Sequence, residues 1–186
     1  MRVDVKRKYA ALLIAIFCLL LPHAVRADSF SLDAISKKLQ SKYHAIQHMP
    51  GEQLLTALSQ DKQQDLLLFD VREKAEYAVS HIKGAHQLNP NSWRRTVMQR
   101  YGQAVKDKTV IFYCSVGVRS SKMASALKAD LLKAGAKGVY NLDQGLFGWA
   151  NQNRPMVNTQ GPTPYIHPYD AHWGQLLTSK QHWRYK

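Results

Sequence analysis

Cysteine is scarce in this sequence, with only Cys18 and Cys114 in a chain of 186 residues. Internal repeats, low-complexity tracts and a second long apolar run are absent too, which excludes a repeat architecture and a protein that crosses a membrane several times. His167, His172 and His182 are irregularly spaced and have no cysteine beside them, so the sequence contains no metal-ligand cluster. We therefore expect neither a metal nor a cofactor.

Residues 1–27 have the pattern of a secretory signal. A basic segment precedes an unbroken apolar run over 10–21, Pro22 ends the run, and Val25 and Ala27 are small residues suited to cleavage before Asp28. The run is too short to span a bilayer comfortably. We expect bacterial export to the periplasm or the medium, with no stable membrane insertion after cleavage. The alternative is a protein anchored by the uncleaved segment.

Cleavage would change two counts. Cys18 would leave with the signal, so Cys114 would remain as a lone thiol that cannot form an internal disulfide, and this suggests a reactive sulfur. Acidic residues are also few, 13 against 26 Lys and Arg, and losing the signal lowers the formal net charge from +13 to +9. Because the basic residues are scattered and export is expected, small anionic substrates are favoured over nucleic acid.

Short apolar segments alternate with helical patterns along the rest of the chain. Strands are predicted at 66–69, at 109–113, at 139–142 and in a short segment ending near 88. A short helix is predicted to begin at Pro50, and another to include Tyr77. Further helices are predicted over 93–101, from the loop after Cys114 to about residue 134, and over 145–149. This alternation predicts an α/β fold with a central parallel sheet of about five strands and helices on both faces. An amphipathic helical extension over 28–44 precedes the domain, which is expected to span 45–157.

The segment around Cys114 carries the clearest chemical pattern. A β-branched and aromatic run ends at this cysteine, and a loop of small residues leads into a helix whose N-terminus suits Ser120 and Ser121. Backbone N–H groups and the positive end of that helix would stabilise a thiolate. Gly117 would allow the tight turn that brings these amides to the sulfur. The alternative, from residue type alone, is a buried structural cysteine.

Four groups of residues resemble those of a single-domain rhodanese, a sulfurtransferase module. They are 68–72 with 76–77, then 80–85, then 114–120, and finally 145–149 with 154–155. One departure is Gln144, where many relatives have a second glycine beside Gly145. The resemblance implies a rhodanese-like fold over 45–157.

The resemblance also implies a reaction. Cys114 would attack a small anionic sulfur donor such as thiosulfate, become a persulfide, and pass the sulfur to cyanide or a thiol. Arg119 would grip the donor or hold the loop. The implied substrate-binding residues are Ser115, Val116, Gly117, Val118, Arg119 and Ser120. Asp70 and Arg72 match positions that we interpret as structural, forming a buried ion pair or a cap beside the site.

Two other functions compete with this one. Relatives that hydrolyse phosphate esters have a loop one residue longer, so the four residues between Cys114 and Arg119 disfavour a phosphatase or an arsenate reductase. A non-catalytic rhodanese-like module that binds a protein partner is the alternative from another class. The intact Cys114 loop favours the enzyme, because a binding module has no need of a nucleophile.

The C-terminal extension, residues 158–186, lies beyond the resemblance and is rich in aromatic residues. Such a composition does not suit a flexible tail, so we expect it to cover the domain or to dock on a protein partner. Tyr165, Tyr169 and Trp173 recur at intervals of four, which predicts a short helix with one aromatic face. We expect that face to pack on the domain or on the N-terminal helix.

Overall fold

The computed structural model describes residues 30–60 and 62–186, so the predicted signal segment 1–27 lies outside the described residues. The strands are β1 (Gln47–Met49), β2 (Leu66–Asp70), β3 (His86–Gln87), β4 (Thr109–Tyr113), β5 (Gly138–Leu142), β6 (Val157–Asn158) and β7 (Gly161–Pro162). The α-helices are α2 (Leu32–Lys42), α3 (Gly51–Ser59), α4 (Lys74–Val79), α5 (Arg94–Tyr101), α6 (Val118–Lys133), α7 (Gly145–Asn151) and α8 (Ala171–Gly174). Short 3-10 turns occur at η2 (Gln63–Asp65) and η3 (Lys180–His182). None of the helices in the described part of the chain has the length and apolar character needed to cross a membrane.

The central sheet has five parallel strands in the order β1-β5-β4-β2-β3, which confirms the predicted α/β architecture. β2 and β4 lie side by side in its middle, with Asp70 opposite Tyr113 at their carboxyl ends. Both strands are nearly continuous apolar runs, as expected for strands that are covered on both faces. β1 was not predicted from the sequence, because three residues at a sheet edge carry too short a pattern.

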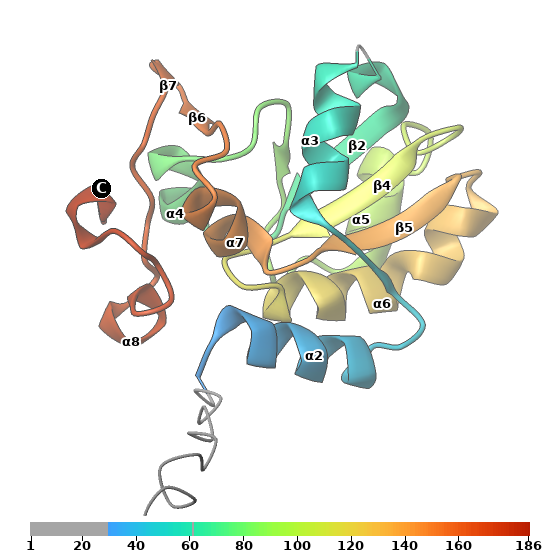
Figure 1. Ribbon diagram of the computed structural model, residues 1–186. Helices are drawn as coiled ribbons and strands as arrows, with labels where there is room; N and C mark the ends of the chain where they lie inside the picture. The colour runs from blue at the N-terminus through green and yellow to red at the C-terminus, as the bar shows by residue number, and fades with distance from the viewer. Residues whose placement is uncertain (1–29, 61) are drawn as a thin grey trace, which may run out of the picture.

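Alternate residues of β4 face two separate apolar layers. Val110 and Phe112 pack in one layer with residues of α5 and α6, whereas Ile111 and Tyr113 pack in the other with residues of α3 and α7. Figure 1 shows the helices on the two sides of the sheet, with α2 running alongside α6. Cys114 directly follows β4, so both layers hold the strand that carries it.

The N-terminal extension forms the predicted helix. Ser31 caps α2 by accepting a hydrogen bond from the N–H of Ala34 at 3.1 Å. Leu39 is buried on the face that the apolar spacing indicated. Ser36 and Asp143 are hydrogen-bonded, which ties α2 to the turn between β5 and α7. The extension is therefore joined to the carboxyl end of the sheet.

The prediction of a helix with one aromatic face in the C-terminal extension is wrong. Within the extension only residues 171–174 are α-helical, and Tyr169 has a left-handed backbone with φ of 68°. Pro168 lacks a backbone N–H, and the segment before it is extended, with a bridge from Ile166 to Trp183. The ring of Tyr165 is consequently exposed instead of sharing a buried face.

The extension nevertheless packs against the domain, as expected. Ile166, Leu176 and Leu177 are buried in the apolar layer that covers Ile111 of β4. Asn151 of α7 donates a hydrogen bond to the carbonyl of Leu176 at 2.8 Å. In Figure 1 the extension lies next to α4 and α7. These contacts make residues 158–186 an integral layer of the fold.

Replacing Ile166 with alanine tests this packing. The side chain is buried, so Ile166→Ala should lower the free energy of unfolding by about 2–5 kcal/mol. Its neighbour Tyr165 is 39% exposed and stacks on Arg184, so Tyr165→Ala should cost about 1 kcal/mol or less. Urea unfolding of both variants measures the difference. Equal and small losses would contradict a packed extension.

Candidate active site

Cys114 lies at the carboxyl end of the central strand, in the turn that leads into α6. The residue is 1% exposed, and the backbone N–H of Gly117 donates a hydrogen bond to Sγ at 3.3 Å. Gly117 has φ of 96°, a conformation that glycine adopts without strain. A Cβ at this position would also lie 3.1 Å from a methyl group of Leu39 and 3.2 Å from the amide of Asn141. The loop geometry at the sulfur therefore requires glycine.

The first turn of α7 holds the backbone of the cysteine loop. The N–H of Leu146 donates to the carbonyl of Cys114 at 2.8 Å, and the N–H of Phe147 donates to the carbonyl of Ser115 at 2.9 Å. Gly145 makes this close approach possible, because a Cβ there would lie 2.5 Å from the Cys114 carbonyl oxygen. The first N–H groups of α7 thus hold the carbonyls of the cysteine loop in place.

The departure at Gln144 has a structural explanation. Gln144 has φ of 58°, in the left-handed region that favours glycine. Its side-chain amide donates a hydrogen bond to Asp33 of α2 at 2.6 Å. This bond provides a favourable contact that glycine lacks and links the turn before α7 to the N-terminal extension.

Arg119 is held by Glu76, a residue of α4. The Nη1 and Nη2 atoms donate to the two carboxylate oxygens of Glu76 at 2.7 and 2.8 Å. Ser115 joins them: its hydroxyl donates to Glu76 and accepts from Arg119 Nη2, each at 3.0 Å. The side chain of Glu76 is 3% exposed and that of Arg119 is 25% exposed. This arrangement fixes the start of α6 on α4, so of the two roles expected for Arg119 the geometry favours holding the loop.

The two charges in this pair stabilise each other. Burial alone would raise the pKa of Glu76, but the hydrogen bonds and charge of Arg119 outweigh it and lower the pKa. Burial alone would lower the pKa of Arg119, but its hydrogen bonds to Glu76 and the charge of that carboxylate outweigh burial and raise the pKa. Both groups are therefore ionised at neutral pH. Glu76 was not predicted as a site residue, since nothing in its sequence context identifies its partner.

Asp70 and Arg72 form a separate, fully buried ion pair. Arg72 donates from Nε and Nη2 to the two carboxylate oxygens at 2.8 and 2.6 Å, and Nη2 also donates to the carbonyl of Ser80 at 2.6 Å. Burial alone would lower the pKa of Arg72, but the Asp70 carboxylate outweighs it and raises the pKa. The pair connects the end of β2 to the segment that follows α4.

A small pocket opens at Cys114. Its volume is about 130 Å³, and the loop contributes Cys114, Ser115, Val116, Val118 and Arg119 to its lining. The other lining residues, Tyr169 and Trp173, belong to the C-terminal extension.

Two residues of the predicted binding set do not line this pocket. Gly117 contacts the sulfur through its N–H, and Ser120 is buried in the first turn of α6, where its hydroxyl donates to Asn141 at 2.6 Å. The two pocket residues of the extension were not predicted, because their spacing indicated a helix instead of a wall over the loop.

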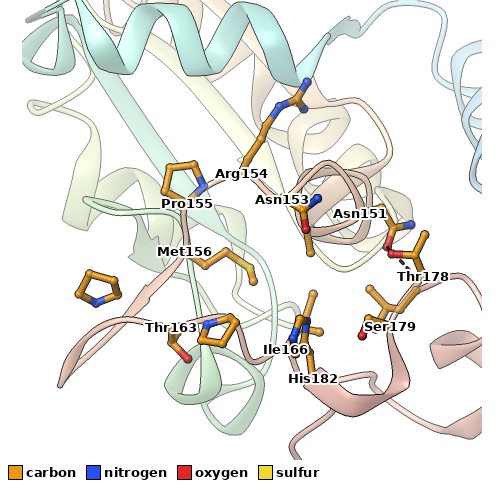
Figure 2. A pocket seen from close by; sticks show the side chains of 14 residues that line it. Asn151, Asn153, Arg154, Pro155, Met156, Thr163, Ile166, Thr178, Ser179 and His182 are labelled. Carbon is orange, nitrogen blue, oxygen red and sulfur yellow. Dashed lines mark hydrogen bonds between the residues drawn. The ribbon is translucent and has the colours of Figure 1, made fainter.

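A second cavity, of about 350 Å³, lies between α7 and the C-terminal extension. Figure 2 shows Met156, Ile166 and Thr163 around it, and the guanidinium of Arg154 pointing away from the other labelled side chains. Cys114 does not line this cavity. Of these two cavities, Cys114, the nucleophile expected from the sequence, therefore lines only the smaller one.

The fold and the site place this protein in one structural class: parallel α/β domains that carry a cysteine between the central strand and the following helix. The Rhodanese-like domain family matches residues 52–152, and the chain belongs to that family. The matched region lies within the domain predicted over 45–157, whereas α2 and the C-terminal extension lie outside it.

Two relatives have sulfurtransferase in their names. The chain is 34% identical over 98 residues to a protein named sulfurtransferase from Allochromatium vinosum, covering 53% of this chain and 84% of that protein. It is 36% identical over 95 residues to the probable adenylyltransferase/sulfurtransferase MoeZ of Mycobacterium tuberculosis, covering 51% of this chain and 23% of MoeZ. The chain thus spans about a quarter of MoeZ. These relatives support sulfur transfer at the level of the family.

A solved structure supports the fold. The thiosulfate sulfurtransferase of Pseudomonas aeruginosa superposes with a TM-score of 0.51 at 21% sequence identity, covering 70% of this chain and 23% of that one. At this identity the likeness shows a shared rhodanese fold.

Replacing Glu76 with glutamine tests the buried pair. The variant should lose about 1.5–3 kcal/mol of unfolding free energy at neutral pH, because Arg119 loses its charged partner. The pKa of Glu76 lies below its ordinary value of 4.5 in the folded protein, so this stabilisation is present above pH 4.5 and is lost as the pH falls through the lower folded pKa.

Urea unfolding at neutral pH and at a series of acidic pH values measures this difference. Glu52→Gln, at an exposed position in α3, is the matched control and should change little at any pH. A loss in Glu76→Gln that stayed the same down to strongly acidic pH would contradict an ionised, buried Glu76.

Proposed function

We propose that this protein is a sulfurtransferase that carries sulfane sulfur as a persulfide on Cys114. In the first step the thiolate attacks the outer sulfur of a small anionic donor such as thiosulfate, the donor's S–S bond breaks, and sulfite leaves. In the second step cyanide or a thiol attacks the outer sulfur of the persulfide. The bond to Cys114 Sγ breaks, and the thiolate is regenerated with thiocyanate or a hydropersulfide as product.

The observation that carries the proposal is the position of the Cys114 sulfur. It opens onto a pocket at the start of a 16-residue helix and accepts a hydrogen bond from Gly117. The positive end of α6 and the loop amide favour negative charge on the sulfur in both steps. The loop is held from α7 and from α4, so this environment exists before the donor arrives.

The position of the C-terminal extension supports the enzyme over a non-catalytic binding module. Under the competing hypothesis the extension would dock on a protein partner, whereas its apolar residues Ile166, Leu176 and Leu177 are buried on the domain. Two of its aromatic residues line the Cys114 pocket. The extension therefore contacts the domain and the pocket at Cys114, which is the arrangement expected if it contributes to an active site.

Export to the periplasm or medium forms part of the proposal. It rests on the basic segment, the apolar run and the cleavage pattern within 1–27. Expression of the full chain followed by N-terminal sequencing of the exported fraction tests it. A mature chain beginning at Asp28 is expected, whereas full-length protein in the membrane fraction would support the uncleaved anchor.

Sulfur loading is the direct test of the activity. After incubation with thiosulfate, intact-mass analysis should show a gain of roughly 32 Da per chain on Cys114, the mass of one sulfur atom bound to the nucleophile. Two oxygen atoms add nearly the same mass, so the gain must disappear on treatment with cyanide, which removes only sulfane sulfur. The same gain in Cys114→Ala would sink the assignment.

Arg119→Lys tests what the arginine does. If it holds the loop, the variant should load sulfur more slowly by about tenfold or more, since a point charge replaces a bidentate contact with Glu76. The slowing should be the same for thiosulfate and for an uncharged sulfur donor. A defect confined to the KM for thiosulfate would instead assign Arg119 to binding the donor anion.

A further inference from the structure

We propose that Tyr169 and Trp173 form a wall that selects sulfur carriers by size. This wall admits thiosulfate and cyanide to Cys114, slows the reaction of larger thiols such as glutathione, and excludes the thiols of folded proteins. The reaction itself rests on the proposed function. The selecting residues belong to the C-terminal extension, which lies outside the 52–152 family match.

The first observation is the burial of the nucleophile. Cys114 is 1% exposed, and the space at its sulfur is a pocket of about 130 Å³. Val116 and Val118 line the pocket from the loop, and the two aromatic residues line it from the extension. A donor must enter this space to be attacked by Cys114, and an acceptor must enter it to attack the outer sulfur of the persulfide. The bulk next to the reacting atom therefore decides whether either molecule reacts.

The second observation is the conformation of Tyr169. A tyrosine with φ of 68° is in a region that bulky residues rarely adopt, and such strain is concentrated at functional sites. The turn is held by the N–H of Tyr169, which donates to His167 Nδ1 at 3.0 Å, and by the N–H of Asp170, which donates to the Pro168 carbonyl at 3.0 Å. The ring consequently lies 5.1 Å from the guanidinium carbon of Arg119.

The third observation is that Trp173 is supported from two directions. Asp170 caps α8 by accepting from the N–H of Trp173 at 2.8 Å. Phe30, just before α2, packs against the Trp173 ring with centroids 5.7 Å apart. The wall is therefore built from both extensions of the domain and is fixed in place before a carrier binds.

The selection is steric. Arg119 is the charged residue in the lining, and its charge is balanced by Glu76. Apart from Cys114 and Ser115, whose hydroxyl is bonded to Glu76, the rest of the lining is apolar or aromatic, so it offers little to attract one charged carrier over another. A pocket of this kind discriminates through the fit of the groups next to the reacting sulfur.

Alkylation of the Cys114 thiol tests the wall independently of sulfur transfer. The full chain is treated with iodoacetamide, a small reagent, or with fluorescein maleimide, a bulky one, and peptide mapping follows modification at Cys114. The wall variants are Tyr169→Asn, which suits the left-handed backbone, and Trp173→Leu, which keeps an apolar side chain. Matched controls are Tyr165→Ala in the same extension and Trp93→Ala, an 82%-exposed tryptophan.

The ratio of the bulky to the small reagent's rate should rise about tenfold or more in both wall variants and stay unchanged in both controls. An unchanged ratio in either wall variant, or an equal rise in the controls, would overturn the proposal.

A second measurement ties the wall to the reaction. Protein loaded with sulfur from thiosulfate is mixed with cyanide or with glutathione, and the single-turnover rates are compared. The wall variants should increase the glutathione rate relative to the cyanide rate, and an unchanged ratio would overturn the size selection. Failure of the wild type to load sulfur would refute the proposed function while leaving the alkylation result to decide on the wall.

Discussion

The geometry of the site depends on the buried carboxylate of Glu76. This carboxylate accepts hydrogen bonds from both terminal nitrogens of Arg119 and from the hydroxyl of Ser115, so it joins α4 to the loop between β4 and α6. A carboxylate removed from water needs a cation and hydrogen-bond donors in compensation, and Arg119 supplies both. One consequence is that the arginine nearest the sulfur carries a balanced charge. Under the proposed function, attraction for an anionic donor then falls to the loop backbone and the N-terminus of α6.

The same loop is fixed from its other side by backbone contacts. Leu146 and Phe147 at the start of α7 bind the carbonyls of Cys114 and Ser115, and Gly145 permits the approach. α2 and the C-terminal extension add further contacts, with Leu39 beside Gly117 and Tyr169 over Arg119. The rhodanese domain thus supplies Cys114, the proposed nucleophile, and the segments that flank the domain complete the walls around this cysteine.

Much of the fold could be predicted from the sequence because the relevant signals are local. The apolar runs of β2 and β4 indicate strands covered on both faces, and the small-residue loop after Cys114 indicates a turn into a helix. β1 escaped prediction because three edge residues have no detectable period.

The missed parts of the site depend on tertiary contacts. Glu76 lies 43 residues from Arg119 along the chain, and on a short helix a glutamate usually faces solvent. Tyr169 and Trp173 have helical spacing, and only the left-handed turn after Pro168 brings them over the loop.

The central claim is that Cys114 holds a transferable sulfur inside a pocket that is lined on one side by the C-terminal extension. A crystal structure of the protein after exposure to thiosulfate tests it most directly. The account predicts one additional atom about 2.05 Å from Cys114 Sγ, the length of a sulfur–sulfur bond, lying between the loop and the rings of Tyr169 and Trp173. An unmodified sulfur, or an added atom on a cysteine open to solvent with the two rings turned away, would contradict it.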